Sequence, residues 1–305
     1  MSSSISEKYL LAETAAHLGV EWTDPSLQRE FWKISDGSSL SSLRWGDDTP
    51  QAVFLHGGGQ NAHTWDAVAL LLGKSIVAID MPGHGHSDWR EDKAYWPLTN
   101  AAAAAEVLDQ MKFSSPIALI GMSLGGLTAI RLAALRPDLF SSVTIIDVTP
   151  SQMAQMKKMS EQEKGTTALT QGPARYATLQ DMITATAALA PHRSAVLIER
   201  GVVHNAREFE DGQWGWRYDK LVSDEKVKDG ESPDFDELWD DVSAIAMPMM
   251  LIRGGESAFV TEEHVAEFKT RAPQLRFEIV DGAGHSVQSD RPAELAAVLT
   301  TFIYS

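Results

Sequence analysis

The chain of 305 residues is long enough for one large α/β domain with an insertion, or for two domains, around a substantial core. Its 26 basic and 42 acidic side chains give a formal net charge of -16, which argues against nucleic acid and anionic membranes as partners. The absence of cysteine excludes disulfides, thiolate metal sites and a cysteine nucleophile.

Targeting signals are not visible in the sequence. No apolar run approaches the roughly 18 residues that a membrane span needs, and the first residues lack a basic region followed by an apolar one. We therefore expect a protein without a membrane span, with the cytoplasm as its default location.

The first 45 residues predict a peripheral helix and a hairpin. Apolar side chains recur at helical spacing at Leu10, Leu11, Ala15 and Leu18. The stretch Phe31 to Trp45 alternates around Asp36-Gly37, a dipeptide that favours a tight turn between two antiparallel strands.

A short apolar strand, Ala52 to Leu55, ends in His56 followed by three glycines. Successive glycines weaken regular structure, so they indicate a loop whose backbone comes close to another group. In an ester hydrolase that group is the substrate oxygen. We assign an oxyanion-binding N–H to Gly58, with Gly57 and Gly59 as exchangeable neighbours, and a glycine turn without a ligand is the alternative.

The next buried strand, Ile76 to Ile79, leads into a loop that contains His84 and His86. Two histidines at this spacing, without a third ligand nearby, favour a structural loop over a metal site. An alanine-rich helix is predicted from Thr99 to Met111, with Thr99 as its cap.

The stretch Ile117 to Leu135 combines a buried strand with a helix, and Ser123 lies between them. Glycine at 121 and 125 fits this pattern, because a Cβ at either position would collide where the chain reverses. Ser123 is therefore predicted to be a nucleophile on a sharp turn. The N–H of Leu124, in the first turn of the helix, is the other predicted oxyanion donor.

A second strand, Val143 to Ile146, ends in Asp147, which is a candidate acid because it follows a strand beside the nucleophile. Strand and helix alternation then ceases. We interpret residues 151–241 as a helical insertion that covers the site, with helical pieces from Tyr176 to Ala190 and from His192 to Val203. Met153, Met156 and Met159 at spacing three are either core residues or part of an adaptable lid.

Strand character returns at Met249 to Ile252 and again at Arg276 to Val280. Thr261 is placed to cap the helix between these strands. His285 follows the last strand on a glycine-rich loop, where catalysis explains a histidine better than core packing does. A helix from Pro292 to Phe302 closes the chain.

Four motifs resemble the α/β-hydrolase family: LHGGGQNAHTW at 55–65, DMPGHGHSD at 80–88, GMSLGG at 121–126 and DGAGHSVQSDRP at 281–292. The resemblance covers residues 31–303. It implies an α/β fold with a mostly parallel eight-stranded sheet flanked by helices and a helical cap inserted after strand six. Residues 1–150 and 242–305 would then form the core domain, and residues 151–241 the cap.

One position departs from the family pattern. Where many members carry the acid after the seventh strand, this chain has Ala258. Asp147 is the preferred acid, because some relatives, such as haloalkane dehalogenases, carry it at the matching place, and Glu256 is the alternative. Geometry must decide between them.

The predicted activity is hydrolysis of a small or medium uncharged carboxylic ester by Ser123, His285 and an acid, without a cofactor or a metal. Three alternatives stay open: a carbon–carbon bond hydrolase acting on ring-cleavage products, a cofactor-free perhydrolase, and a non-catalytic binding protein on the same scaffold. The sequence does not determine an oligomeric state.

Overall fold

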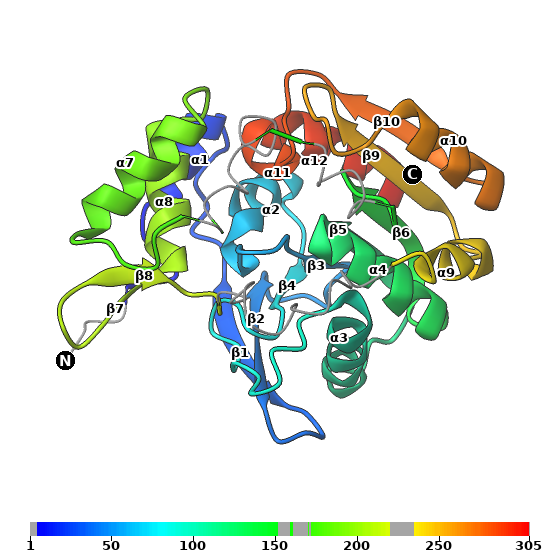
Figure 1. Ribbon diagram of the computed structural model, residues 1–305, viewed down its shortest axis with the longest axis horizontal. Helices are drawn as coiled ribbons and strands as arrows, with labels where there is room; N and C mark the ends of the chain where they lie inside the picture. The colour runs from blue at the N-terminus through cyan, green and yellow to red at the C-terminus, as the bar shows by residue number, and fades with distance from the viewer. Residues whose placement is uncertain (1–4, 152–158, 161–169, 171, 220–234, 305) are drawn as a thin grey trace.

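The computed structural model describes residues 5–151, 159–160, 170, 172–219 and 235–304 (Figure 1). Its centre is an eight-stranded sheet with the order β1-β2-β4-β3-β5-β6-β9-β10. The strands are β1 (Leu27–Lys33), β2 (Ser39–Trp45), β3 (Ala52–Leu55), β4 (Ile76–Asp80), β5 (Ile117–Met122), β6 (Phe140–Ile146), β9 (Met249–Gly254) and β10 (Arg276–Val280).

Strand β2 pairs in antiparallel fashion with both of its neighbours, and the remaining pairs in the sheet are parallel. The predicted mostly parallel eight-stranded sheet is thus confirmed. The predicted hairpin is also present, with Gly37 at a φ of 84° in its turn. Its first strand begins at Leu27, four residues before the expected start at Phe31, because these residues pair with the end of β2.

Helices cover both faces of the sheet and create two cores (Figure 1). Side chains of α3 (Pro97–Met111), α4 (Leu124–Leu135), α9 (Leu238–Ala244) and α10 (Glu262–Arg271) pack against one face. The other face packs against α1 (Leu11–Leu18), α2 (Asp66–Leu72), α11 (Val287–Asp290) and α12 (Pro292–Ile303). Within the described ranges, none of the helices combines the length and apolar character needed to cross a bilayer.

The two predicted helix caps differ in outcome. Thr261 caps α10 as expected, since its side chain accepts a hydrogen bond from the N–H of His264. The prediction that Thr99 caps α3 is wrong, because the helix already begins at Pro97, whose restricted φ suits the first helical position. Thr99 lies within the first turn, and its hydroxyl accepts the N–H of Trp96 at 3.2 Å.

The inserted segment contains α7 (Leu179–Leu189), α8 (Ala195–Asn205) and a hairpin of β7 (Ala206–Glu208) and β8 (Trp214–Trp216). It lies at one side of the sheet, next to α1 (Figure 1). These elements share a small apolar core of their own, made by Tyr176, Met182, Ile198, Val202, Ala206, Trp216 and Tyr218. The hairpin corrects the expectation that the insertion is helical throughout.

The predicted methionine stripe and the predicted end of the insertion differ from the structure in what can be compared. Met153 and Met156 lie outside the described residues, whereas Met159 is buried. The expected boundary at residue 241 falls inside α9. Side chains of this helix pack in the same core as those of α3, α4 and α10. Helix α9 therefore belongs with the sheet rather than with the α7–α8 elements.

Candidate active site

Ser123 lies on a tight turn between β5 and α4, with φ and ψ of 51° and -119°. The neighbouring glycines have the predicted steric cause. A Cβ on Gly121 would come 2.1 Å from the carbonyl oxygen of Gly125, and a Cβ on Gly125 would come 2.3 Å from that of Leu55. The N–H of Ser123 donates to the carbonyl of Ile146 at 3.0 Å, which ties the turn to strand β6.

His285 lies within hydrogen-bonding reach of both Ser123 and Asp147. Its Nε2 is 3.0 Å from Ser123 Oγ, and its Nδ1 is 2.7 Å from Asp147 Oδ2. The ring of Phe259 stacks on the imidazole with a centroid distance of 3.6 Å. All four side chains are buried. The structure therefore brings together the serine, the histidine and the preferred carboxylate, although their positions in the sequence are far apart.

Asp147 is held by hydrogen bonds from a second segment of the chain. The N–H of Gly254 donates to its Oδ1 at 3.0 Å, and the hydroxyl of Ser257 donates to its Oδ2 at 2.5 Å. Its φ of 52° lies in the left-handed region, which aspartate tolerates better than most residues do. Nothing in the sequence singled out Ser257 and Phe259, although both flank Ala258, the position at which the chain departs from the family pattern.

Glu256, the alternative acid, lies at the surface of the protein. Its residue is exposed, and its backbone N–H bonds to the carbonyl of Ala283. Among the described residues, no hydrogen bond joins its carboxylate to His285.

The three glycines after His56 differ in what their N–H groups do. Gly57 donates to Gln60 Oε1 at 3.0 Å, and Gly59 donates to His84 Nε2 at 3.1 Å. Within the part of the chain that the structure describes, the N–H of Gly58 has no acceptor. The same is true of the N–H of Leu124, which opens helix α4. Both groups assigned to the oxyanion are thus available for a ligand.

Two buried histidines hold the glycine loop against the loop after β4. His84 accepts the N–H of Gly59, and His56 Nε2 in turn accepts the N–H of Met81 at 3.0 Å. Burial lowers the pKa of both rings, that of His56 to about 3, with the nearby His84 as a further cause. Both imidazoles are therefore neutral near pH 7, as an acceptor nitrogen requires. This explains His84 as a structural residue of its loop.

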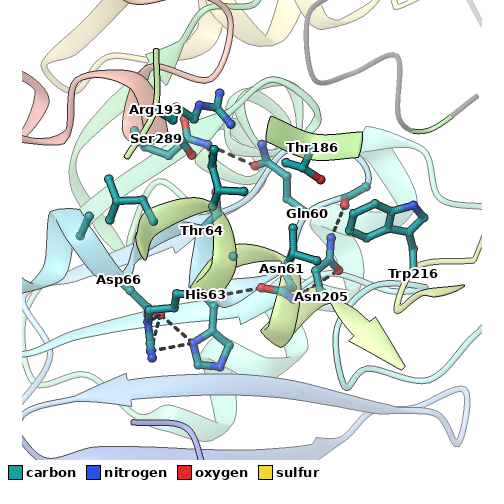
Figure 2. Close-up of a pocket in the computed structure, with 18 of the residues that line it drawn as sticks. Gln60, Asn61, His63, Thr64, Asp66, Thr186, Arg193, Asn205, Trp216 and Ser289 are labelled. Carbon is teal, nitrogen blue, oxygen red and sulfur yellow. Dashed lines mark hydrogen bonds and ion pairs between the residues drawn. The ribbon is translucent and has the colours of Figure 1, made fainter. Parts of the chain in front are cut away.

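A cavity of about 150 Å³ lies between the glycine loop and the α7–α8 elements (Figure 2). Gly58 belongs to its lining, whereas Ser123 and His285 do not. Polar side chains from both sides line it, among them Gln60, Asn61, Thr64, Thr186, Arg193, Asn205 and Ser289. The cavity therefore adjoins the candidate site through the glycine loop.

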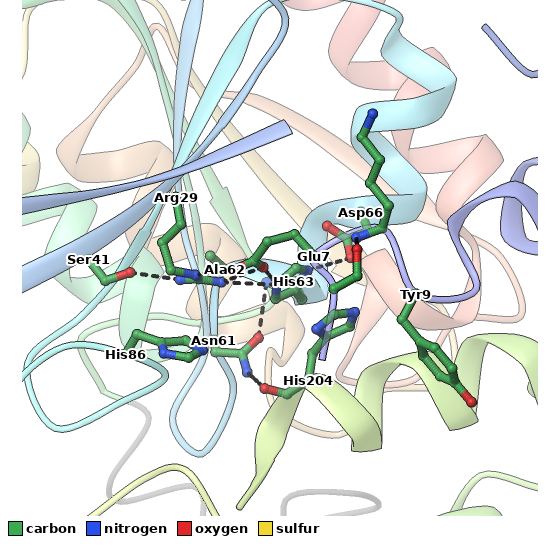
Figure 3. Close-up of polar contacts among 12 residues, drawn as sticks. Glu7, Tyr9, Arg29, Ser41, Asn61, Ala62, His63, Asp66, His86 and His204 are labelled. Atoms are coloured by element: carbon green, nitrogen blue, oxygen red, sulfur yellow. Dashed lines mark hydrogen bonds and ion pairs between the residues drawn. The ribbon is translucent and has the colours of Figure 1, made fainter. Parts of the chain in front are cut away.

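A buried charged cluster next to this cavity contains the one group of described residues with metal-ligand spacing, Glu7, His63 and His204 (Figure 3). Their ligand atoms lie within 4.8 Å of one another. However, Arg29 donates to Glu7 at 2.6 Å and places a second nitrogen 3.0 Å from His63 Nε2. A metal ion would have to displace this guanidinium, so the cluster is better explained as an ion-pair network.

His63 is the centre of that network. Its Nε2 lies 2.6 Å from Glu7 Oε2, and its Nδ1 lies 2.8 Å from Asp66 Oδ2. Burial opposes the charged ring, but the contacts with Asp66 and Glu7 outweigh it and raise the pKa of His63. His204 stacks on this ring at 3.7 Å, and burial, followed by the charges of His63 and Arg200, lowers its pKa to about 2. The network joins the N-terminal segment, the sheet and helix α8.

The fold is that of α/β hydrolases, and residues 52–298 match the model of the alpha/beta hydrolase family. The chain belongs to this family and is a hydrolase. The resemblance to this family that the sequence motifs indicated is thus confirmed.

Comparison with individual proteins supports the same class. The esterase Rv0045c of Mycobacterium tuberculosis is 44% identical over 298 residues, which cover 97% of this chain and 95% of the relative. A crystal structure of that esterase superposes with a TM-score of 0.85 at 42% identity, and the match covers 99% of this chain and 100% of the other. The esterase YbfF of Escherichia coli is 25% identical, with 75% of this chain and 82% of the relative covered.

Proposed function

We propose that this protein is a serine esterase that hydrolyses small or medium uncharged carboxylic esters through an acyl-enzyme. The observation that carries the proposal is the arrangement of His285, whose two ring nitrogens lie 3.0 Å from Ser123 Oγ and 2.7 Å from Asp147. A nucleophile, a base and an orienting acid in this order define a catalytic triad. The 44% identity to a named esterase is consistent with ester chemistry.

In the proposed mechanism, His285 Nε2 accepts the Ser123 proton while Oγ forms a bond to the ester carbonyl carbon. The protonated imidazole then gives this proton to the leaving alkoxide as the carbon–oxygen bond breaks. Asp147 keeps the proton of His285 on Nδ1 and stabilises the charged ring. Water attacks the acyl-enzyme by the same route, which releases the acid and restores Ser123.

The N–H groups of Gly58 and Leu124 would bind the oxyanion of each tetrahedral intermediate. Donors that are already oriented toward a developing charge lower the barrier, each by about 2.7 to 4 kcal/mol. The hydrogen bonds from Gly57 to Gln60 and from Gly59 to His84 favour this assignment, because they leave Gly58 as the one glycine N–H of the loop without an acceptor among the described residues.

The cavity beside Gly58 supports a limit on substrate size. A cavity of about 150 Å³ holds a group of about the size of benzene. We therefore expect the rate to peak with short or medium acyl chains and to fall for decanoate. The α7–α8 elements and their hairpin would act as the cap that encloses this group. A cytoplasmic location stays a prediction from the sequence.

A panel of nitrophenyl esters from acetate to decanoate tests the proposal, with Ser123→Ala as the control. We expect a burst of nitrophenol from the wild-type protein and covalent labelling of Ser123 by a fluorophosphonate. Absence of both would favour the binding-protein alternative. Turnover of dienol ketoacids but not of simple esters would indicate a carbon–carbon hydrolase, and peroxide-dependent halide oxidation in acetate would indicate a perhydrolase.

A further inference from the structure

We propose that the cavity beside Gly58 binds an uncharged acceptor oxygen, an ether or a carbonyl, in the part of the ester remote from the scissile bond, with Gln60 as the donor. This inference rests on the proposed esterase function and names the class of ester. It would make Gln60 a specificity-determining residue, because it lies in the cavity lining two positions after Gly58.

The amide of Gln60 has a defined orientation. Its Oε1 accepts the backbone N–H of Gly57 at 3.0 Å and also a hydrogen bond from Gln288 Nε2 at 3.3 Å. Exchanging the oxygen and nitrogen of this amide would place its NH₂ group against the backbone N–H of Gly57. Two donors would then face each other, so the orientation with Oε1 toward Gly57 is the correct one. Gln60 Nε2 is therefore the atom left over, and it has no acceptor among the described residues.

Two of the amide oxygens around the cavity, those of Asn61 and Asn205, are already used, whereas the buried Oε1 of Gln288 has no partner among the described residues. Asn61 Oδ1 accepts the N–H of His63 at 3.0 Å, and Asn205 Oδ1 lies 3.3 Å from Asn61 Nδ2. The nitrogen of Asn205 donates to the carbonyl of Gly59 at 2.8 Å. A ligand with an acceptor oxygen would find the free N–H groups of Gln60, and a donor group on the same ligand would find the unpartnered Gln288 Oε1.

The charges around the cavity favour a neutral acceptor over a carboxylate. Arg193 lines the cavity, but its Nε donates to the buried Asp290 at 2.6 Å. Arg200 is paired with Asp66 at 2.5 Å. Because each guanidinium is balanced by a carboxylate and the chain carries a net charge of -16, the cavity offers hydrogen-bond donors without an excess of positive charge.

The physical basis of the selectivity is the cost of an unpaired donor. An alkyl group that fills the cavity removes water from Gln60 Nε2 without replacing its hydrogen bond. An ether oxygen of the same size restores that bond. Sites that hydrogen-bond a substrate reject analogues that lack the partner atom, and a single neutral hydrogen bond gives a selectivity of about tenfold in kcat/KM.

Two isosteric substrate pairs test the proposal, because either half of the ester could occupy the cavity. The acyl pair is nitrophenyl 3-methoxypropanoate and nitrophenyl pentanoate, and the alcohol pair is 2-methoxyethyl acetate and butyl acetate. After correction for the chemical reactivity of each ester, we expect kcat/KM to favour the ether by about tenfold in one pair. Equal kcat/KM values for the ether and the alkyl ester in both pairs would overturn the proposal. The esterase function is tested separately, because hydrolysis of nitrophenyl pentanoate by the wild type and not by Ser123→Ala would support it in either case.

The variant Gln60→Glu links the preference to this residue. Its carboxylate can still accept from Gly57 and Gln288 but offers no N–H to the cavity, so the ether preference should disappear even if the absolute rate falls. Thr186→Ser is the matched control on the opposite side of the cavity. The hydroxyl of Thr186 donates to the carbonyl of Met182, and serine keeps this hydroxyl, so the ether preference should be unchanged. A preference that survives Gln60→Glu would refute the assignment of the donor.

Discussion

Replacing Asp147 by asparagine tests the proposed catalytic triad without a change in the size of the side chain. Asparagine tolerates the left-handed φ of 52° at this position, so the fold should persist. The N–H of Gly254 is a fixed donor 3.0 Å from Oδ1, and it would keep the amide oxygen on its side. The NH₂ group would then face His285 Nδ1, which would have to become an acceptor and leave the ring proton on Nε2.

A ring protonated on Nε2 cannot take the proton of Ser123. Loss of the correct tautomer in a triad lowers kcat by about ten-thousandfold, equivalent to about 5.5 kcal/mol of activation free energy. Nitrophenyl ester turnover at pH 7 to 8 measures this loss, and thermal unfolding checks that the variant is folded. The exposed Glu256 provides the control, because Glu256→Gln should change kcat less than twofold, or about 0.4 kcal/mol.

The reverse result would contradict the proposed triad. If Asp147→Asn kept more than about one tenth of the wild-type kcat, corresponding to a loss below about 1.4 kcal/mol, the carboxylate would not control the tautomer of His285. A large loss in Glu256→Gln would show that this loop rearranges when substrate binds.

Three further changes test the scaffold around the site. Gly125→Ala should destabilise the protein by about 3 kcal/mol, because the new Cβ would lie 2.3 Å from a backbone oxygen. Gly201→Ala should instead stabilise it by about 0.8 to 1 kcal/mol, because a Cβ at that position meets no atom within 4 Å. Denaturant unfolding measures both changes, and equal effects would contradict the steric argument. His84→Leu should lower kcat by about tenfold, since the N–H of Gly59 loses its acceptor. His84→Gln should recover part of that loss. Similar kcat values in the two variants would show that the hydrogen bond from Gly59 to His84 does not affect catalysis. The pKa of His63 is raised in the folded protein, so its charged form stabilises the fold. This stabilisation is complete at a pH below the unfolded pKa of about 6.5, and it is lost as the pH rises through the folded pKa. The destabilisation caused by His63→Gln should therefore be larger near pH 6 than near pH 9, and a pH-independent difference in unfolding free energy would count against the charged ring.

Predictions from the sequence succeeded where neighbouring residues impose the geometry. The turn at Ser123 is such a case, because Gly121 is required by its contact with Gly125 inside the same turn, although Gly125 itself meets the carbonyl of Leu55 on strand β3. The strands were recognisable for a similar reason, since buried parallel strands need continuous apolar runs. Helix starts were less certain, and Thr99 was misplaced because Pro97 already satisfied the first turn.

The partners of the candidate site could not be predicted in the same way. Whether Asp147 or Glu256 faces His285 depends on how strands β6, β9 and β10 lie side by side. No local pattern encodes the distance between Asp147 and His285, which are 138 positions apart in the chain. The same holds for the acceptors that occupy Gly57 and Gly59, because Gln60 and His84 are suitable only once two loops meet.

The sequence by itself determined the turn at Ser123, the alternation of strands and helices, and the order of Ser123, Asp147 and His285 along the chain. The tertiary structure alone decided their approach to within hydrogen-bonding distance, which carboxylate contacts His285, which glycine N–H stays available and which residues line the cavity. Hydrophobic periodicity specifies which side of an element is buried. Hydrogen bonds between distant loops, however, require donor and acceptor atoms to be placed to within a few tenths of an ångström, and only the packed sheet provides that precision.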